Sequence, residues 1–427
     1  MNGPLKVALL GCGTVGSAVL RLLQDQSGDL AARIGRPVEV AGVAVRRPAH
    51  HPDVPAHLLT TDDHGLVTRD DVDLVVEVIG GIEPARSLML AAFEAGKSVV
   101  SANKALLADD GVALHAAASK AGVDLYYEAA VAGAIPLLRP LRESLAGDQL
   151  RRVVGIVNGT TNYILSRMSE TGAGFTEALA EATELGYAEA DPTADVDGFD
   201  AAAKAAILAS LAFHTPVTAA DVYREGITKV TQADIAFAEK LGYAVKLLAI
   251  AEVIDGEIAM RVHPAMIPLN HPLASVRDNL NAIFVEGAEV GELMFYGRGA
   301  GGAPTAISVI GDVVDIARHL VGGGRGAGSI YSQPAKVRPM DHNVSQYYIL
   351  LEVADKPGVL ALVAQTFTDN NVSIKSVWQE GMGDEARLVM VTHSAQESDF
   401  QSLLAALRDL DVVDAIASSM RVQSSDD

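Results

Sequence analysis

A glycine-rich loop near the N-terminus constrains the fold of this chain more than any other feature. Residues 5–10 (LKVALL) form a short apolar run, and apolar residues at helical spacing continue beyond the loop to Leu23. A Gly-x-Gly-x-x-Gly loop between a strand and a helix permits a tight turn, a close approach of the backbone to a pyrophosphate, and close helix packing. We expect a dinucleotide at the N-terminus of this helix, with a purely structural glycine turn as the alternative. The loop consists of Gly11, Cys12, Gly13, Thr14, Val15 and Gly16.

Alternating strand and helix signals extend over the first 130 residues. Strands that are apolar on both faces and alternate with helices are typical of a parallel sheet. The fold class expected for this part is therefore α/β, a Rossmann-like doubly wound sheet. Apolar runs occur at 38–45, 72–79, 97–101 and 123–127, and alanine-rich helical stretches lie between them, such as 84–95 and 108–121.

The pattern changes near residue 131. A strand at 151–157, several helices and a run of strands within 243–295 indicate an α+β domain for substrate binding and dimerisation at 131–302. The apolar helix at 303–320 is predicted to pack back on the first domain. The dinucleotide-binding domain is then 1–130 plus 303–320, and the α+β domain is an insertion in it.

The C-terminal part restarts with a new pattern. Residues 321–345 are rich in Gly, Ser and Pro without an apolar period, which indicates a linker. Beyond it, residues 346–427 form a separate domain whose elements follow the order βαββαβ. This order is that of the ferredoxin-like fold.

Net charge and cysteine usage restrict the partners. The chain has 33 Lys and Arg against 54 Asp and Glu, and its net charge of −21 repels nucleic-acid phosphates and anionic lipids. Cys12 is the only cysteine, which excludes an internal disulfide and suits a reducing compartment, the cytoplasm. Glycines interrupt the apolar stretch 7–23, so we expect no signal peptide and a mature chain that starts near Met1.

The end of the second predicted strand bears on the choice of dinucleotide. Val45 is followed by Arg46 and Arg47, where an acidic residue would bind the 2′-hydroxyl of NAD. Guanidinium groups suit a 2′-phosphate, so Arg46 favours NADP(H), with NAD(H) still possible. Two solvated loop arginines are the alternative. Gly302, in a second glycine cluster before the 303–320 helix, is a further candidate for cofactor contact, or part of a plain loop.

Two segments carry candidate catalytic residues. Ser101 and Lys104 lie at the carboxyl end of the strand at 97–101, where ligands bind in such sheets, so we expect Ser101 to bind the cofactor and Lys104 to face the nicotinamide. Residues 186–204 hold five carboxylates, followed on a predicted helix by Lys204 four residues after Asp200. Helical residues at this spacing share one face, and a lysine desolvated beside a carboxylate can carry protons. A solvated acidic loop with an ordinary ion pair is the alternative.

Six motifs in order resemble those of homoserine dehydrogenase over residues 5–320: GCGTVG, SANKALL, YYEAAVAGAIP, GIVNGTTNYIL, LGYAEADPTADVDGFDAAAK and GRGAGGAPTA. The resemblance implies hydride transfer between a nicotinamide and C4, interconverting L-homoserine and L-aspartate 4-semialdehyde in threonine, methionine and isoleucine biosynthesis. It implies Lys104 and Lys204 as proton-transfer lysines, with Lys104 also near the substrate and cofactor. Asp200 would orient substrate and lysine, Glu189 would bind the substrate ammonium, and Asp195 would help hold the amino acid.

The same resemblance implies a monovalent cation, Na⁺ or K⁺, between the cofactor and substrate domains. Its ligands would be mostly backbone carbonyls of Glu128, Val131, Gly133 and Ile135. Histidines 50, 51, 57 and 64 lie in a loop without helical register, which argues against a transition-metal site there. Since no aspartokinase segment precedes Met1, the chain resembles the monofunctional branch.

Residues 346–421 resemble an ACT domain. The segment LLEVADKPGVLALVAQTFTDNNVSIKSVWQ contains the strand, the Asp-x-Pro-Gly turn at 355–358, the helix and the second strand. The resemblance implies side-by-side pairing in a homodimer or homotetramer and an amino-acid effector, threonine. A dimerisation module that has lost its ligand is the alternative.

Two rival functions are weighed against this interpretation. A related NADP-dependent enzyme such as an aspartate dehydrogenase should lack the 189–204 block, which is present. A catalytically silent amino-acid sensor would not need Lys104, Asp200 and Lys204 together. Cys12 lies inside the cofactor loop and is the only cysteine, so oxidation of an aldehyde through a thiol nucleophile is excluded and alcohol/carbonyl chemistry remains.

Overall fold

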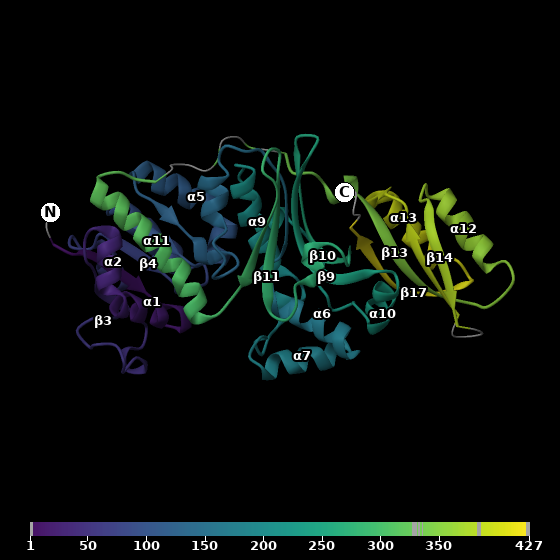
Figure 1. Cartoon of the computed structure of the whole chain (residues 1–427), viewed down its shortest axis with the longest axis horizontal. Coiled ribbons are helices and arrows are strands. Elements are labelled where there is room, and N and C mark those ends of the chain that lie inside the picture. The colour runs from purple at the N-terminus through teal and green to yellow at the C-terminus, as the bar shows by residue number, and fades with distance from the viewer. Residues whose placement is uncertain (1–2, 327–330, 332–333, 335, 382–385, 424–427) are drawn as a thin grey trace. The chain divides into compact units, whose positions relative to one another are not determined.

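The computed structural model describes residues 3–326, 331, 334, 336–381 and 386–423 (Figure 1). The chain divides into two compact units, each built from separated segments. The first unit comprises residues 1–153, 203–222 and 281–335, and the second comprises 154–202, 223–280 and 336–427. Part of the predicted linker, residues 327–330, 332–333 and 335, lies outside the described residues. Over the described part of the chain, no helix is long and apolar enough to cross a membrane.

The first unit contains a six-stranded parallel sheet in the order β3-β2-β1-β4-β5-β6. The order reverses between β1 and β4, which is where ligands bind in sheets of this type. The Rossmann-like prediction is confirmed. The strands are β1 (Leu5–Leu10), β2 (Val38–Ala44), β3 (Leu59–Thr60), β4 (Leu74–Glu77), β5 (Ser98–Ser101) and β6 (Leu125–Tyr126).

Two groups of helices pack on this sheet. One group is α1 (Thr14–Asp25), α2 (Ser27–Ile34) and α11 (Gly302–Gly322), and the other is α3 (Asp63–Thr68), α4 (Ala85–Glu94) and α5 (Lys104–Ala121). Helix α11 shares one apolar core with β1 and α1, in which Leu9, Val19 and Val309 are fully buried. Further strands of the first unit are β11 (Leu280–Gly287) and β12 (Gly291–Arg298), which are neighbours, and most of β7 (Leu150–Ile156).

The second unit contains a long antiparallel pair, β9 (Tyr243–Ile254) and β10 (Glu257–Pro268). The short strand β8 (Tyr223–Arg224) lies parallel to β10 on the same sheet. Helices of this unit are α6 (Gly159–Thr171), α7 (Phe175–Glu184), α8 (Thr193–Val196) and α10 (Gln232–Lys240). Helix α9 (Phe199–Ala212) begins in the second unit and continues into the first from Ala203.

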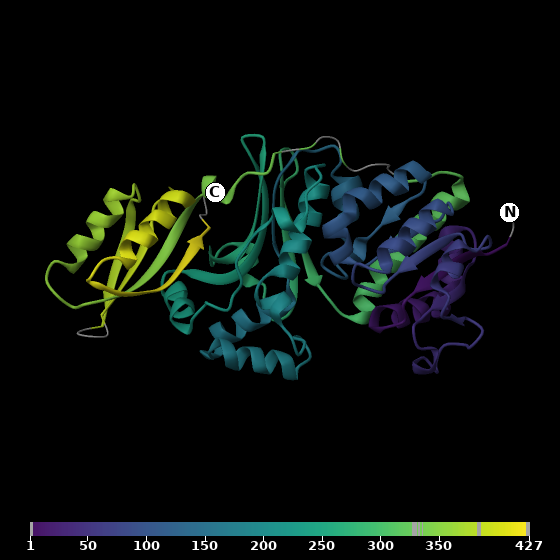
Figure 2. The same ribbon diagram turned by 180° about the vertical axis from the view of Figure 1, so that it is seen from behind.

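The C-terminal module has the predicted order βαββαβ, which Figure 2 shows from behind. Its strands lie in the order β17-β13-β15-β14, and the last strand pairs with β10 in parallel through Arg421 and Val422. Strand β14 is the other edge of this sheet, and its Trp378 is 42% exposed. The elements are β13 (Val344–Val353), α12 (Val359–Asp369), β14 (Ile374–Glu380), β15 (Arg387–Thr392), β16 (Ala395–Gln396), α13 (Glu397–Arg408) and β17 (Val413–Val422).

Candidate active site

Packing within the chain requires a glycine at two of the three glycine positions of the loop. A Cβ atom on Gly16 would lie 2.2 Å from the carbonyl oxygen of Gly11, so helix α1 can approach the loop only because Gly16 has no side chain. Gly11 has a φ of +96°, and a Cβ there would lie 2.9 Å from the Val78 carbonyl oxygen. A Cβ on Gly13, in contrast, would meet nothing within 4 Å. Packing within the chain therefore does not require a glycine at position 13, and the open space there would admit the close approach of a pyrophosphate that the sequence motif predicts.

A cavity of about 520 Å³ lies at this loop and at the ends of β2 and β4. Its size and its wall of free backbone at a helix N-terminus fit a dinucleotide. Exposed Arg46 and Arg47 lie on the wall, and His50 and His51, which the sequence pattern left as solvated loop residues, lie there as well. Cys12 is also on the wall, and burial raises the pKa of its thiol, which disfavours the nucleophilic thiolate.

Gly302, the first residue of α11, lies against the glycine loop. A Cβ atom on it would be 2.9 Å from the carbonyl oxygen of Thr14. The second glycine cluster therefore meets the first inside one unit, where two segments far apart in sequence come together. The absence of a side chain at position 302 is what allows this approach.

A buried carboxylate holds the turn that leads to Lys104. Glu77, at the end of β4, is fully buried and accepts hydrogen bonds from Ser101 Oγ (2.7 Å) and Ile79 N (2.8 Å). Ser101 Oγ in turn accepts from Asn103 N at 3.0 Å, and Asn103 Oδ1 caps α5. Lys104 is therefore the exposed first residue of α5, and the hydrogen bonds of Glu77, Ser101 and Asn103 fix the start of this helix. The Ser101 hydroxyl donates its proton to Glu77, so any cofactor contact from this hydroxyl would be as an acceptor.

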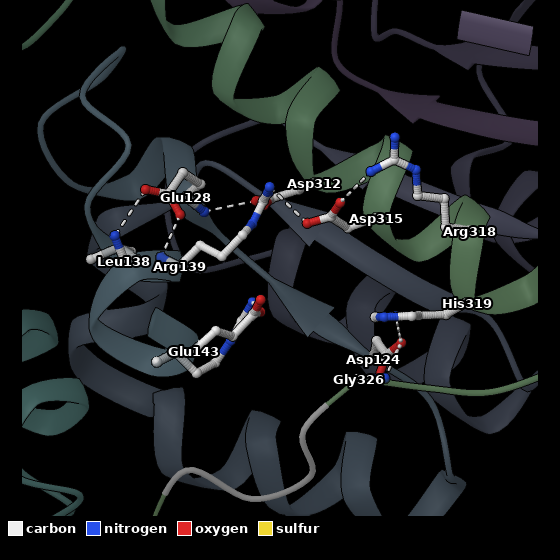
Figure 3. Close-up of polar contacts among 11 residues, drawn as sticks. Asp124, Glu128, Leu138, Arg139, Glu143, Asp312, Asp315, Arg318, His319 and Gly326 are labelled. Carbon is white, nitrogen blue, oxygen red and sulfur yellow. Dashed lines mark hydrogen bonds and ion pairs between the residues drawn. The ribbon is translucent and has the colours of Figure 1, made fainter. Parts of the chain in front are cut away.

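The predicted cation ligands belong to the turn at 128–135, which begins at Glu128. Figure 3 shows Glu128 with Leu138, Arg139 and Asp312. The buried Glu128 carboxylate accepts from the backbone N–H groups of Leu137, Leu138 and Arg139 at 2.5–2.8 Å. Its own N–H donates to Asp312 at 2.7 Å, and burial together with the charge of Glu128 raises the pKa of Asp312 to about 7.

Three N–H groups therefore occupy the Glu128 carboxylate, so a cation at this turn would have to use main-chain carbonyl oxygens. Gly133, with a φ of +52°, presents a carbonyl that accepts from Ser308 Oγ at 2.7 Å and has a second lone pair. The donor set suits a monovalent cation. The cation, with Val131 and Ile135 as further ligands, stays a prediction.

In the second unit, one asparagine joins two of the predicted carboxylates. Asn158 Nδ2 donates to Asp195 Oδ1 at 2.6 Å and to Asp200 Oδ2 at 2.9 Å. Its Oδ1 accepts from Thr161 N at 2.9 Å and thereby caps α6. Asp200 is 7% exposed and stands in the first turn of α9, where the helix dipole favours an anion. The cap fixes the Asn158 side chain, and its amide nitrogen holds the Asp195 and Asp200 carboxylates close to each other.

The remaining predicted residues are distributed over both units. Glu189 lies on the exposed segment after α7 in the second unit. Lys204 is 8% exposed and one turn along α9 from Asp200, in the part of that helix that belongs to the first unit, as does Lys104. Sequence reasoning assigned no role to Glu77 or Asn158. Two signals were available in the sequence. Glu77 is a carboxylate at the end of an apolar strand, and Asn158 is an asparagine directly before a helix.

The parallel sheet, the glycine loop with its cavity and the C-terminal module define a nicotinamide-dependent oxidoreductase with a regulatory ACT domain. Residues 11–128 match the family model of the homoserine dehydrogenase NAD binding domain, residues 136–314 that of homoserine dehydrogenase, and residues 347–412 that of the ACT domain. The chain belongs to the homoserine dehydrogenase family and is an NAD(P)-dependent oxidoreductase that acts on a CH–OH group.

Similar proteins cover the whole chain. Homoserine dehydrogenase of Mycobacterium tuberculosis is 55% identical over 433 residues, which is 99% of this chain and 98% of that protein. The crystal structure of a homoserine dehydrogenase from Thiobacillus denitrificans superposes with a TM-score of 0.95 at 38% identity, covering 99% of this chain and 100% of that one. A hyperthermophilic archaeal homoserine dehydrogenase mutant in complex with NADPH has a TM-score of 0.64 at 27% identity, covering 73% and 97%.

The double hydrogen bond from Asn158 yields a prediction for Asn158→Asp. Aspartate keeps the helix cap, because its carboxylate can still accept from Thr161 N, but it removes the donor and adds a third negative charge beside Asp195 and Asp200. We expect kcat/KM for homoserine to fall roughly 100-fold, since hydrogen bonds to charged groups are lost and repulsion replaces them. The KM for the dinucleotide and the melting temperature serve as internal controls. A kcat/KM for homoserine within twofold of wild type would contradict the proposed role.

Proposed function

We propose that the enzyme prefers NADP(H) and interconverts L-homoserine and L-aspartate 4-semialdehyde in the cytoplasm, on the route to threonine, methionine and isoleucine. The observation that carries the proposal is the Asn158-bridged pair of Asp195 and Asp200, with buried Lys204 one turn further along the same helix as Asp200. Carboxylates bind an amino-acid ammonium, and a lysine shielded from water suits exchange of a hydroxyl proton.

Each residue has a role in this scheme. A bound nicotinamide supplies the hydride acceptor for the substrate carbon that carries the hydroxyl. Glu189 and Asp195 bind the substrate ammonium, and Asp200 orients the hydroxyl toward the lysines. Lys204 and Lys104 move the hydroxyl proton as the carbonyl forms, and in the reverse direction they return it to the carbonyl oxygen.

Lys204→Ala tests this scheme. Wild type should oxidise L-homoserine with NADP, and the variant should lose about 10²- to 10⁴-fold in kcat, the usual contribution of a positioned proton carrier. Lys120→Ala, which removes an exposed lysine from α5, is the matched control and should behave as wild type. A wild type inactive on homoserine would end the proposal, and full activity of Lys204→Ala would remove Lys204 from the mechanism.

Preference for NADP(H) is supported by the position of Arg46 and Arg47 on the wall of the cofactor cavity. Both side chains are exposed, so they can turn toward a 2′-phosphate, for which a guanidinium offers paired N–H donors. The archaeal homoserine dehydrogenase noted above was solved with NADPH, which agrees with this choice.

Arg46→Asp should reverse the preference. An aspartate at this place repels a 2′-phosphate and can accept from a 2′-hydroxyl, so we expect the NADP/NAD ratio of kcat/KM to fall by roughly 100-fold. Arg33→Asp changes the charge equally on α2, outside the residues that line the cavity, and should leave the ratio unchanged. An unchanged ratio in Arg46→Asp would contradict the assignment.

Regulation by an amino acid is the last part of the proposal. Among the described residues of the ACT module, β14 is an edge strand with exposed Val377 and Trp378, which suits side-by-side pairing in a homodimer or homotetramer. Threonine is the effector we propose. If the ACT module had lost its ligand, it would still pair through β14 but would not respond to threonine.

Added threonine should lower the rate of homoserine oxidation and raise the melting temperature. A ligand at a hundredfold excess over its Kd stabilises the folded state by about 2.7 kcal/mol, which a melting curve resolves. Valine has the same shape without the hydroxyl and serves as the control amino acid. If threonine changes neither the rate nor the melting temperature, regulation by this amino acid is excluded.

A further inference from the structure

The turn between Asp195 and Asp200 sets how far apart these two carboxylates lie. Helix α8 ends at Val196, Asp197 and Gly198 form the turn, and α9 begins at Phe199. Gly198 has a φ of +80°, which a residue with a side chain rarely adopts. The short turn thus places one carboxylate before it and the other just after it.

A neighbouring segment, Tyr223–Gly226, holds this turn. The Arg224 guanidinium lies 3.4 Å above the ring centre of Phe199, and its Nη1 donates to the carbonyl oxygen of Asp197 at 2.5 Å. A Cβ atom on Gly226 would lie 2.3 Å from the Val196 carbonyl oxygen, so the two backbones are in direct contact. The ring of Phe199, in a side chain that is 49% exposed, therefore has Arg224 on one face.

Glu225, the residue after Arg224 in this segment, connects the segment to the C-terminal module. Glu225 accepts from Arg421 Nη1 at 2.9 Å, and Arg421, on β17, also pairs with Glu397 at 2.6 Å. Arg421 and Glu397 are 4% and 2% exposed, so this ion pair is held without water. Removing one partner of such a pair leaves a buried charge uncompensated. The buried pair with Glu397 fixes Arg421 within the ACT domain, and from there its Nη1 reaches the Glu225 carboxylate, whose side chain is 39% exposed.

Open space lies beside these contacts. A cavity of about 580 Å³ is lined by Asp197, Arg224 and Glu225 and also by Arg408 and Ser418 of the ACT domain. Beside this cavity, the Arg421 ion pair with Glu225 connects β17 to the segment that holds the turn.

We propose that Tyr223–Gly226 is a coupling segment, in which Arg224 is a positioning residue for the turn between Asp195 and Asp200 and Glu225 links that turn to the ACT domain. The proposal rests on the substrate-binding role given above to Asp195 and Asp200. Arg224 acts through the turn. Its loss should therefore affect binding of the amino acid and spare the dinucleotide site, which lies in the other unit.

Four variants test the coupling segment by steady-state kinetics. Arg224→Ala should raise the KM for homoserine about tenfold with kcat and the KM for NADP within twofold, because misplaced binding groups weaken substrate binding first. Arg224→Lys should recover part of the loss, since an ammonium can still donate to Asp197 and lie over Phe199. Glu225→Gln should raise the KM for homoserine about threefold, because the neutral amide weakens the link to Arg421.

The matched control is Lys240→Ala. It breaks another contact with the ACT domain, the exposed ion pair of Lys240 with Glu380 at 2.8 Å, which does not involve the coupling segment. This variant should have wild-type constants. If Glu225→Gln has the same homoserine KM as Lys240→Ala, the link to the ACT domain is wrong; if Arg224→Ala raises both KM values equally or neither, the positioning role is wrong.

Hydrogen exchange provides a measurement that does not depend on activity. Peptides covering residues 193–200 should exchange faster in Arg224→Ala and Glu225→Gln than in wild type or Lys240→Ala, because the turn has lost a fixed partner. Should Arg224→Ala fail to fold, Arg224→Met decides in its place, because it keeps a long side chain without the charge or the N–H donors: unchanged kinetics and exchange there overturn the proposal. A wild type inactive on homoserine would instead refute the proposed function, and exchange would still test the coupling.

Discussion

Carboxylates removed from water and surrounded by fixed hydrogen-bond donors organise the functional parts of this protein. A buried carboxylate without donors is strongly unfavourable, so each one dictates the position of the groups around it. Glu77 fixes the turn before Lys104, and Glu128 gathers three backbone N–H groups at the predicted cation turn. Asp200 shares the amide of Asn158 with Asp195, and Glu397 holds Arg421. These interactions hold the segments that carry the residues proposed to bind the cofactor and the substrate.

The same principle attaches the ACT domain to the rest of the second unit. Asp234, fully buried on α10, caps its own helix with Thr231 and accepts from Tyr348 of β13 at 3.2 Å and from Ser418 of β17. Together with the ion pairs of Arg421 with Glu225 and of Lys240 with Glu380, these hydrogen bonds attach the module in addition to the two-residue pairing of β17 with β10. A regulatory domain attached through few, specific contacts can act on a substrate loop without sharing a large core with it.

Local patterns predicted much of the fold. The glycine loop, the apolar strand at 5–10 and the βαββαβ order of the ACT domain depend on residues close in sequence, and the structure agrees with them. Strand β3 and helix α3 were not predicted, because they have only two and six residues, too few for an apolar period to be recognised. The division of the chain into domains at residues 131, 303 and 321 stays a prediction.

The candidate site was predictable only in part. The residue types at 189–204 indicate amino-acid binding and proton transfer, yet the partners that hold them are distant in sequence. Asn158 reaches carboxylates 37 and 42 residues away, and Glu77 reaches a hydroxyl 24 residues away. No local period encodes such contacts. These contacts form only in the folded chain, when strands and helices that are each predicted from their own local pattern end next to one another.

Helix α9 has a consequence for how the site can change. It carries Asp200 in its first turn and Lys204 in its second, and the chain passes from one compact unit to the other between them, at Ala203. The four residues from one to the other rise about 6 Å along the axis, a spacing maintained by the hydrogen bonds of the helix itself. The helix backbone therefore fixes the axial spacing of Asp200 and Lys204, although the two residues are assigned to different units. A change that moved the start of α9 would carry both residues with it.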